Sequence, residues 1–270
     1  MIKDNEKMIG LLDSGLGGLS VYQVLKRCLP TEKVIYVGDT IHAPYGEKTD
    51  QQIQQFVFSI IDFMIEKGAK IVVMACNTAT AVALEEARSR YAIPILGVIQ
   101  PGVEAAVATS QNRKIGIIGT EVTIRNKSYE KIIRQIDPSI QVFAKACQNQ
   151  IVQMMEKGLM KEERLSTLFN PCVRPLQEAG VDTLVLGCTH YPFLKETIQK
   201  ITGPGITLVN PAEKVVELLQ EQLEQKPLGY LPNNPYEDQF YISGDAHLFA
   251  TVAEQLLKHP LSCYKQIELK

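Results

Sequence analysis

Two cysteines lie at the ends of short apolar segments in two distant parts of the chain. Residues 71–75 lead into Cys76, and residues 183–187 lead into Cys188. Short apolar segments rich in β-branched residues are typical of buried parallel strands. Open α/β sheets bind their ligands at the carboxyl ends of such strands. We therefore expect the two thiols to face one small substrate as a pair of acid/base groups.

The residues after each cysteine are suited to stabilising a thiolate. Asn77 and Thr78 follow the first cysteine, while Thr189 and His190 follow the second. Amides at a helix start and a nearby imidazole lower the pKa of a thiol because they favour its charged form. A lone histidine is more often structural, but His190 lies two residues after a candidate thiolate, which favours a catalytic role.

A second pair of similar segments indicates that the chain contains two related halves. Residues 8–15 and 114–121 both read as an apolar strand with glycine near its start and a hydroxyl residue after it. Ser14 and Thr120 are 106 positions apart, and Cys76 and Cys188 are 112 apart. Two pairs at nearly the same spacing favour a duplicated α/β unit, with the site between the copies.

Composition narrows the class of protein. The chain has 270 residues, of which 45% are hydrophobic, and a net charge of −2 without a basic stripe, so we expect no nucleic-acid partner. The first residues contain no apolar stretch of signal-peptide or membrane-span length, so we expect a cytoplasmic protein without membrane contact. Six cysteines without a C-x-x-C pair, in a reducing compartment, predict neither disulfides nor zinc sites. The remaining four are expected to be small buried hydrophobes: Cys28, Cys147, Cys172 and Cys263.

Strand-like segments alternate with helical patterns almost throughout, which predicts a mainly parallel sheet covered by helices. We expect helix-capping boxes at Thr49 and at Asn210. The predicted first domain comprises residues 1–100 and 210–270, and the second comprises residues 101–209. The turn-rich stretch 226–235 is expected to be an irregular loop. The expected strands lie near residues 8–12, 33–37, 71–75, 95–99, 114–118, 140–145, 183–187, 206–209 and 238–242.

Two loops are further candidates for the site. The glycine-rich segment 13–18 follows the first strand and could hold a carboxylate at a helix start, or be a tight turn capped by Ser14. It does not match a dinucleotide fingerprint, which needs glycine where Ser20 stands, and it lacks the Gly-Lys of a phosphate loop. Residues 44–46 (Pro-Tyr-Gly) are either a plain turn or a wall of the site.

Two kinds of chemistry fit these residues. Cys188 with His190 could act as the nucleophile and base of a cysteine hydrolase, but that interpretation leaves Cys76 without a task. Removing a proton from one face of a carbon and delivering one to the opposite face needs two groups, and it uses both cysteines.

The motifs together resemble those of glutamate racemases, the cofactor-independent enzymes of the aspartate/glutamate racemase superfamily. The resemblance covers essentially the whole chain, through segments 13–15, 44–46, 76–78, 119–120 and 187–192. It implies that Cys76 and Cys188 are the acid/base residues, that Asp13 assists Cys76, and that Glu156 and His190 assist Cys188. It also implies that the substrate is held by Ser14, Pro44, Tyr45, Gly46, Asn77, Thr78, Thr120 and Thr189.

The resemblance further implies two pseudo-symmetric α/β domains with the active site in the cleft between them. The expected reaction is interconversion of L- and D-glutamate without metal or pyridoxal cofactor, supplying D-glutamate for bacterial cell-wall synthesis, and we expect a homodimer. The chain departs from the family pattern before Glu156, where Val-Pro is absent and an extra residue stands upstream, and at Gln100, where glutamate is frequent. Racemases of aspartate or hydantoins, a maleate isomerase and a catalytically idle binding protein remain as alternatives.

Overall fold

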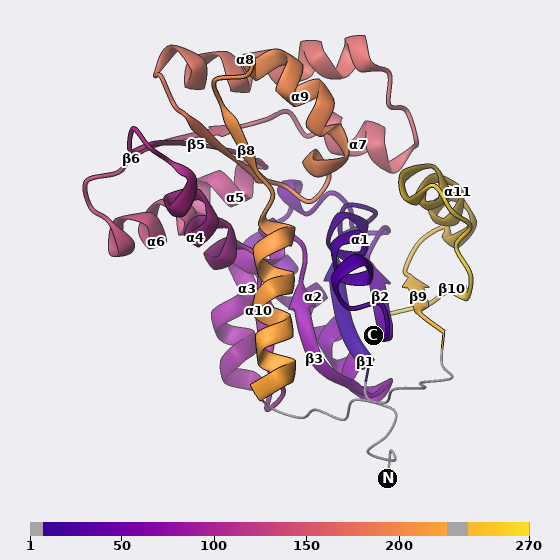
Figure 1. Ribbon diagram of the computed structural model, residues 1–270. Coiled ribbons are helices and arrows are strands. Elements are labelled where there is room, and N and C mark those ends of the chain that lie inside the picture. The colour runs from indigo at the N-terminus through magenta and orange to yellow at the C-terminus, as the bar shows by residue number, and fades with distance from the viewer. Residues whose placement is uncertain (1–7, 226–236, 270) are drawn as a thin grey trace.

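A computed structural model describes residues 8–225 and 237–269 as two sheets surrounded by helices (Figure 1). The strands are β1 (Met8–Asp13), β2 (Val34–Gly38), β3 (Ala69–Met74), β4 (Ile95–Gly97), β5 (Lys114–Gly119), β6 (Gln141–Ala146), β7 (Thr183–Gly187), β8 (Thr207–Val209), β9 (Gln239–Ile242) and β10 (Tyr264–Gln266). The α-helices are α1 (Leu19–Cys28), α2 (Asp50–Glu66), α3 (Asn77–Arg90), α4 (Ile99–Thr109), α5 (Glu121–Asn126), α6 (Ser128–Ile136), α7 (Gln150–Glu156), α8 (Glu162–Glu178), α9 (Lys195–Thr202), α10 (Pro211–Gln225) and α11 (Ala246–Leu257). Two 3₁₀ turns are η1 (Tyr45–Glu47) and η2 (Tyr191–Leu194).

The two sheets repeat one strand order. The larger sheet has the order β10-β9-β2-β1-β3-β4, the smaller one has the order β6-β5-β7-β8, and all neighbouring strands are parallel. The segment β2-β1-β3-β4 therefore corresponds strand by strand to β6-β5-β7-β8. The predicted fold class, two similar α/β units with parallel sheets, is confirmed. Cys76 follows β3 and Cys188 follows β7, so the cysteines occupy corresponding places.

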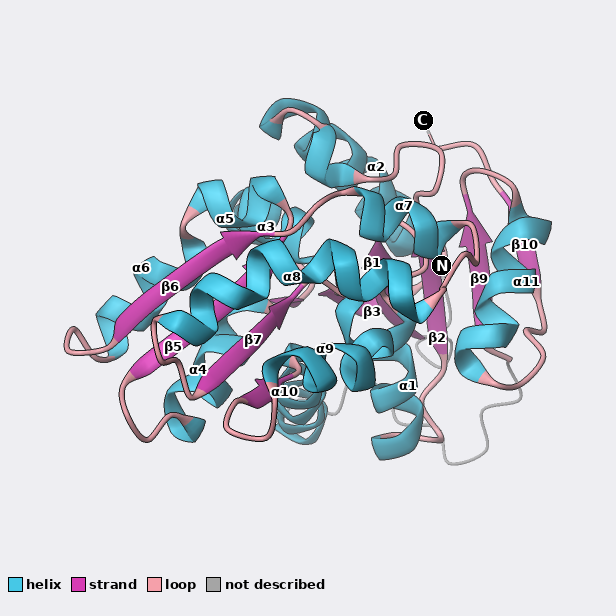
Figure 2. Ribbon diagram, turned by 90° about the horizontal axis from the view of Figure 1, so that it is seen from above, coloured by secondary structure: helices cyan, strands magenta, loops and turns pink. Residues whose placement is uncertain are grey.

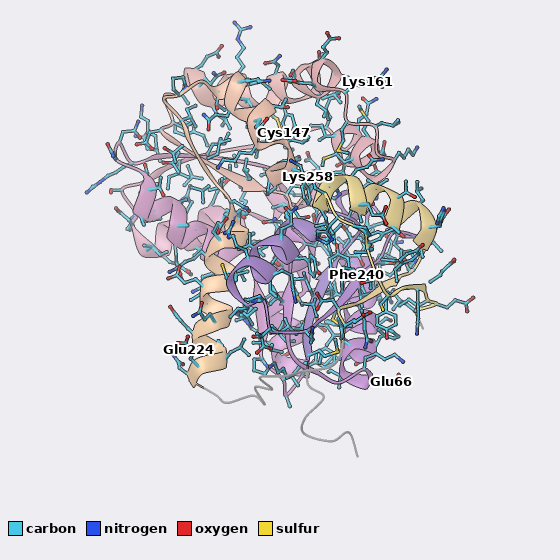
Figure 3. All side chains as sticks on the ribbon, turned by 45° about the vertical axis from the view of Figure 1, so that its right-hand side comes forward. Glu66, Cys147, Lys161, Glu224, Phe240 and Lys258 are labelled. Carbon is cyan, nitrogen blue, oxygen red and sulfur yellow. A yellow bond between two sulfur atoms is a disulfide. The ribbon has the colours of Figure 1, made fainter. Side chains whose placement is uncertain are left out.

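Helices cover both faces of each sheet (Figure 2). Alternate side chains of β1 enter different cores: Ile9 and Leu11 pack with residues of α1, α10 and α11, whereas Met8 and Leu12 pack with residues of α2 and α3. In the smaller sheet, α8 packs over β5 and β6 on one face while α4 contacts β7 and β8. Side chains fill the interior of both halves (Figure 3). These cores fix the strand ends that carry the candidate residues.

Most of the local predictions are confirmed. All nine expected strands are present, and the structure adds the short edge strand β10. Thr49 and Gln52 form the expected capping box. Asn210 Oδ1 accepts from the N–H of Ala212, but Glu213 pairs with Arg27 instead of completing a box. The expected loop at 226–235 lies outside the described residues.

The passage between the halves runs through helices. Pro101, where we placed the domain boundary, lies in the first turn of α4, and this helix contacts both α10 and the strands of the smaller sheet. Helix α10 then runs back beside the larger sheet (Figure 1). The exact division at residues 100 and 210 stays a prediction. No helix in the described part of the chain has the length and apolar character needed to cross a bilayer.

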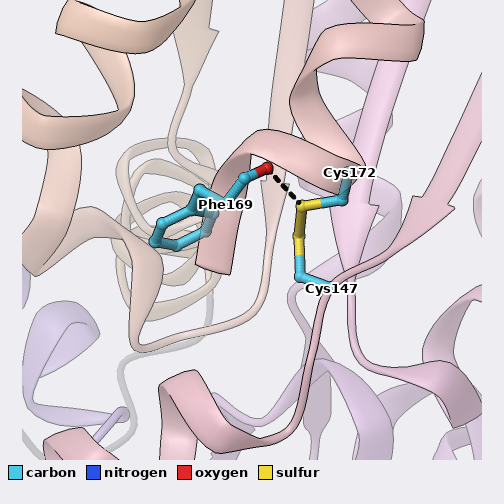
Figure 4. The surroundings of a disulfide bond; sticks show 3 residues. All are labelled: Cys147, Phe169 and Cys172. Atoms are coloured by element: carbon cyan, nitrogen blue, oxygen red, sulfur yellow. Dashed lines mark hydrogen bonds between the residues drawn. A yellow bond between two sulfur atoms is a disulfide. The ribbon is translucent and has the colours of Figure 1, made fainter. Parts of the chain in front are cut away.

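The prediction that the chain has no disulfide is wrong. Cys147, directly after β6, is bonded to Cys172 on α8, with a Cα–Cα distance of 5.4 Å (Figure 4). Spacing along the chain contained no sign of this pair, because only the packing of α8 against β6 brings the two residues together. Cys28 and Cys263 are exposed, so their assignment as buried hydrophobes is also wrong.

Candidate active site

Both candidate cysteines line one small cavity between the two sheets, with a volume of about 20 Å³. Of the thirteen site residues predicted from the sequence, only Asp13 and Glu156 do not reach its wall. The lining residues are Ser14, Pro44, Tyr45, Gly46, Cys76, Asn77, Thr78, Thr120, Val152, Cys188, Thr189 and His190. Val152 is the one wall residue that the sequence interpretation did not include, since a buried valine in a helix carries no chemical signal.

Cys76 stands between β3 and α3 and caps that helix. Its Sγ accepts from the N–H of Ala79 at 3.5 Å and lies 3.7 Å from the Ser14 hydroxyl oxygen. Burial, together with the charge of Asp13, raises the pKa of the Cys76 thiol to about 12, although the contacts with Ala79 and Ser14 lower it. The expectation of a lowered thiol pKa is therefore wrong for Cys76, which is held as the neutral thiol in this closed site.

Asp13 lies behind the cavity at the end of β1 and is fully buried. Its carboxylate accepts from the N–H of Gly15 at 3.0 Å and from the hydroxyl of Thr189 at 3.1 Å. Burial raises the pKa of Asp13 to about 6, and the nearby cationic His190 lowers it in part. Asp13 thus links the β1 loop of one half to the residue after Cys188 in the other.

Two polar side chains lie in series behind Cys188, each in contact with the next. Its Sγ lies 3.7 Å from His190 Nδ1, and His190 Nε2 lies 2.6 Å from Glu156 Oε1. Burial lowers the pKa of His190, but its hydrogen bonds with Cys188 and Glu156 outweigh burial and raise that pKa well above its ordinary value. The imidazole is therefore cationic at neutral pH. The extra residue upstream of Glu156 does not displace its carboxylate from His190.

The glycine-rich loop after β1 does hold a carboxylate, but it is one of the protein's own. The N–H of Leu16 donates to Glu156 Oε1 at 2.8 Å. A Cβ at Gly15 would lie 2.2 Å from the same oxygen, and a Cβ at Gly17 would lie 2.2 Å from Thr189 Oγ1. These glycines let the second half dock directly on the first. Helix α1 begins after Gly18 without a side-chain cap, so Ser14 is not its N-cap.

A buried carboxylate holds the Pro-Tyr-Gly loop in place. Asp39, at the end of β2, accepts from the hydroxyl of Tyr45 at 2.6 Å and from that of Ser243 at 2.7 Å. It also pairs with His42, whose ring stacks on Phe56. The sequence interpretation missed Asp39, although its place after a strand was a signal of the kind used for Asp13.

Threonine hydroxyls also join the two halves. Thr78 Oγ1 lies 2.9 Å from Thr120 Oγ1 and 3.2 Å from Thr123 Oγ1, and the last two are 3.0 Å apart. Thr78 lies in the first turn of α3 and Thr120 caps α5, so this cluster connects the turn after β3 in the first half to the turn after β5 in the second. Among the described residues no group of three or more acidic, histidine or cysteine side chains has a metal-binding arrangement.

The site therefore offers two sulfurs with different proton environments. One is a buried neutral thiol beside a hydroxyl and a carboxylate, and the other lies beside a cationic imidazole, which is a setting that stabilises thiolates. An acid and a base from opposite halves can act on opposite faces of one carbon.

Comparisons with known proteins identify the family of this chain. Residues 9–219 match the model of the Asp/Glu/Hydantoin racemase family. The chain is 42% identical over 253 residues to a glutamate racemase of Corynebacterium diphtheriae, covering 94% of this chain and 95% of that one. It is 38% identical over 261 residues to one of Exiguobacterium sibiricum, covering 97% and 96%.

Solved structures give the same result for the fold. A glutamate racemase isoform of Bacillus anthracis superposes with a TM-score of 0.92 at 34% identity, covering 98% of both chains. One of Francisella tularensis, solved in complex with D-glutamate, superposes with a TM-score of 0.90 at 31% identity, covering 99% of both chains. The chain therefore belongs to the Asp/Glu/Hydantoin racemase family and groups there with the proteins named glutamate racemase.

Proposed function

We propose that this protein interconverts L- and D-glutamate by a two-base mechanism in which Cys76 and Cys188 act on opposite faces of the α-carbon. The observation that carries the proposal is the cavity lined by both cysteines, each at the end of the corresponding strand of its own half. Duplicated geometry of this kind suits a reaction whose two directions are mirror images at the reacting carbon.

The proposed reaction moves one proton at each face. A thiolate at one cysteine removes the α-proton and becomes a thiol, while the thiol at the other cysteine donates its proton to the opposite face and becomes a thiolate. The bond to the original hydrogen breaks and a bond to a new hydrogen forms, so no redox change occurs. In this proposal Cys188, whose Sγ lies 3.7 Å from His190 Nδ1, is the first base, and Cys76, whose pKa is raised by burial, is the proton donor.

The polar neighbours of each sulfur have matching tasks in this proposal. Asp13 and Ser14 assist proton transfer at Cys76, while His190, oriented by Glu156, assists at Cys188. The carbanion-like transition state is stabilised by preorganised donors in a site from which water is excluded. The donors and acceptors proposed to hold the carboxylates and the amine of glutamate are Ser14, Pro44, Tyr45, Gly46, Asn77, Thr78, Thr120 and Thr189.

Substrate entry requires the two halves to separate. A cavity of about 20 Å³ has room for about one water molecule. Glutamate is much larger, so the interdomain contacts at Glu156, Thr189 and Thr120 must loosen before binding. We assign this structure to the closed form of the enzyme.

The wider setting is part of the same proposal. The relatives named above are bacterial glutamate racemases, which supports a role in supplying D-glutamate for peptidoglycan. We further propose a cytoplasmic homodimer that needs neither metal nor pyridoxal phosphate.

The test is racemisation of L-glutamate by the pure, dialysed protein in deuterium oxide, with and without a chelator. We expect D-glutamate to form at the same rate in both, with solvent deuterium on the α-carbon of the product, because the donor thiol exchanges with solvent. L-aspartate serves as the comparison substrate. Strict dependence on added pyridoxal phosphate or metal, or turnover of aspartate alone, would overturn the proposal.

A further inference from the structure

We infer that Tyr129 is a positioning residue, which orients the side-chain amide of Asn77 so that its NH₂ group faces the substrate cavity. The inference rests on the proposed function, because it concerns how that substrate is held. The structural basis is one hydrogen bond, from the Tyr129 hydroxyl to Asn77 Oδ1 at 2.7 Å, which joins α6 of the second half to the start of α3 in the first.

Tyr129 is held rigidly where the halves meet. Its side chain is 2% exposed and packs in the core formed by Ile99, Ile133 and Val185 among others. A Cβ at Gly187, the residue before Cys188, would lie 3.5 Å from the Tyr129 ring. The hydroxyl is therefore placed by the second half but acts on a residue of the first.

The hydrogen bond determines which end of the amide points inward. Burial, together with the charge of Cys188, raises the pKa of Tyr129, so its O–H group is a donor throughout the working pH range. Rotating the Asn77 amide by half a turn would leave this buried O–H without the acceptor that the structure gives it, which is unfavourable. Oδ1 is therefore turned to Tyr129, and Nδ2 is the end left for the cavity.

This orientation matches the charge of the substrate. Asn77 lines the cavity, and its Nδ2 forms no hydrogen bond with another described residue. An N–H donor stabilises a carboxylate, whereas a carbonyl oxygen in the same place repels it. The Tyr129 bond also forms only when the halves are together, so closure and correct orientation of Asn77 occur in one step.

The experiment compares Tyr129→Phe, Asn77→Ala and the double variant by steady-state racemisation of L-glutamate. We expect Tyr129→Phe to raise KM about 5- to 50-fold while kcat changes less than about 3-fold, because the lost contact binds substrate and transition state alike. In the Asn77→Ala background the same tyrosine change should have no further effect. Tyr91→Phe is the control, since that partly buried hydroxyl donates to the carbonyl of Phe58, away from the site.

Asn77→Asp tests the orientation without altering the tyrosine. Its carboxylate can still accept from Tyr129, but it presents an oxygen to the cavity, so we expect KM to rise by more than about 100-fold. An unchanged KM in Asn77→Asp, or additive effects of Tyr129→Phe and Asn77→Ala, would overturn the inference. Either result in an active wild-type racemase leaves the proposed function standing, whereas a wild-type protein without glutamate turnover overturns the proposed function itself.

Discussion

Cys76 and Cys188 occupy corresponding positions, yet their neighbours differ in charge. Cys76 faces Ser14 and the acidic Asp13, whereas Cys188 faces the imidazole of His190. A mirror-image reaction does not need mirror-image residues, because each half needs only one group that can both take and give a proton. What the chemistry requires is that the two sulfurs start in opposite protonation states.

Replacing either cysteine tests the paired mechanism. We expect Cys76→Ala and Cys188→Ala each to lower racemisation by at least about 10²–10⁴-fold, because one thiol cannot remove a proton and return it to the far face. Each single variant should still eliminate a leaving group from a 3-substituted glutamate of matching handedness, since elimination needs only the base. Cys28→Ala, at an exposed free cysteine, is the control. Near-normal racemisation by Cys76→Ala would instead favour a single-nucleophile enzyme.

Asp13 couples activity to stability through its pKa. Because burial raises this pKa from 3.8 to about 6, the folded state favours the protonated acid, and stability from this group is present below pH 4 and lost as pH rises through 6. The shift corresponds to about 3 kcal/mol. We expect Asp13→Asn to unfold at higher denaturant concentration than wild type at pH 7.5, with the difference shrinking towards pH 4.

The same substitution should impair turnover. We expect kcat of Asp13→Asn to fall at least about tenfold, because the carboxylate that assists Cys76 is gone. In the wild type, kcat/KM should rise with pH through about 6 as Asp13 ionises. If Asp13→Asn is instead less stable than wild type at pH 7.5, the burial of the Asp13 carboxylate is not the dominant effect on the free energy of unfolding.

The turn between β1 and α1 acts as the docking surface for the second half. Its glycines leave room for Glu156 and Thr189, and the N–H of Leu16 holds the Glu156 carboxylate. The arrangement of the catalytic residues therefore depends on this loop. Ser14 is the one residue of the loop whose side chain contacts a sulfur. Loop glycines of this kind are needed for close approach between elements.

Gly15→Ala tests this contact. The added methyl would lie 2.2 Å from Glu156 Oε1, so the carboxylate must move away from both Leu16 and His190. A displacement of about 1 Å is enough to lower catalysis about 100-fold, and we expect kcat/KM to fall by that amount or more. Gly205→Ala, where no atom lies within 4 Å of the new methyl, should behave as wild type. Wild-type kinetics for Gly15→Ala would mean that the position of Glu156 is unimportant.

At the scale of the whole molecule, the site exists only where the two halves meet. Bonds between Asp13 and Thr189, between Thr78 and Thr120, and between Tyr129 and Asn77 all connect one half to the other. The disulfide, by contrast, lies within the second half and ties β6 to α8 (Figure 4). It stiffens the part of the chain that leads into α7 and Glu156.

Thiol counting tests the disulfide. In denaturant without reductant the purified protein should show four thiols, from Cys28, Cys76, Cys188 and Cys263, and after reduction it should show six. A cross-link closing a loop of this size stabilises by about 2–4 kcal/mol, so reductant should lower the denaturation midpoint. The Cys147→Ala, Cys172→Ala double variant is the control, because reductant should not shift its midpoint. Six thiols before reduction would contradict the bond.

The sequence by itself determined the α/β class, the strands and the paired cysteines, because these depend on local signals. Each of these signals involves only residues that are close together in the sequence. They are the alternating apolar segments, the capping box at Thr49 and the residues after Cys76 and Cys188. The duplication of the α/β unit was also visible as a repeat in spacing.

Only the tertiary structure decided how those residues interact. The disulfide of Cys147, the contact of Asp39 with Ser243 and the contact of Tyr129 with Asn77 join residues far apart in the chain. The raised pKa of Cys76 has the same origin, since burial and the electrostatic field of Asp13 arise from tertiary packing and not from the residues adjacent to Cys76 in the sequence. Distance and desolvation are properties of the folded chain, so no local pattern could have contained them.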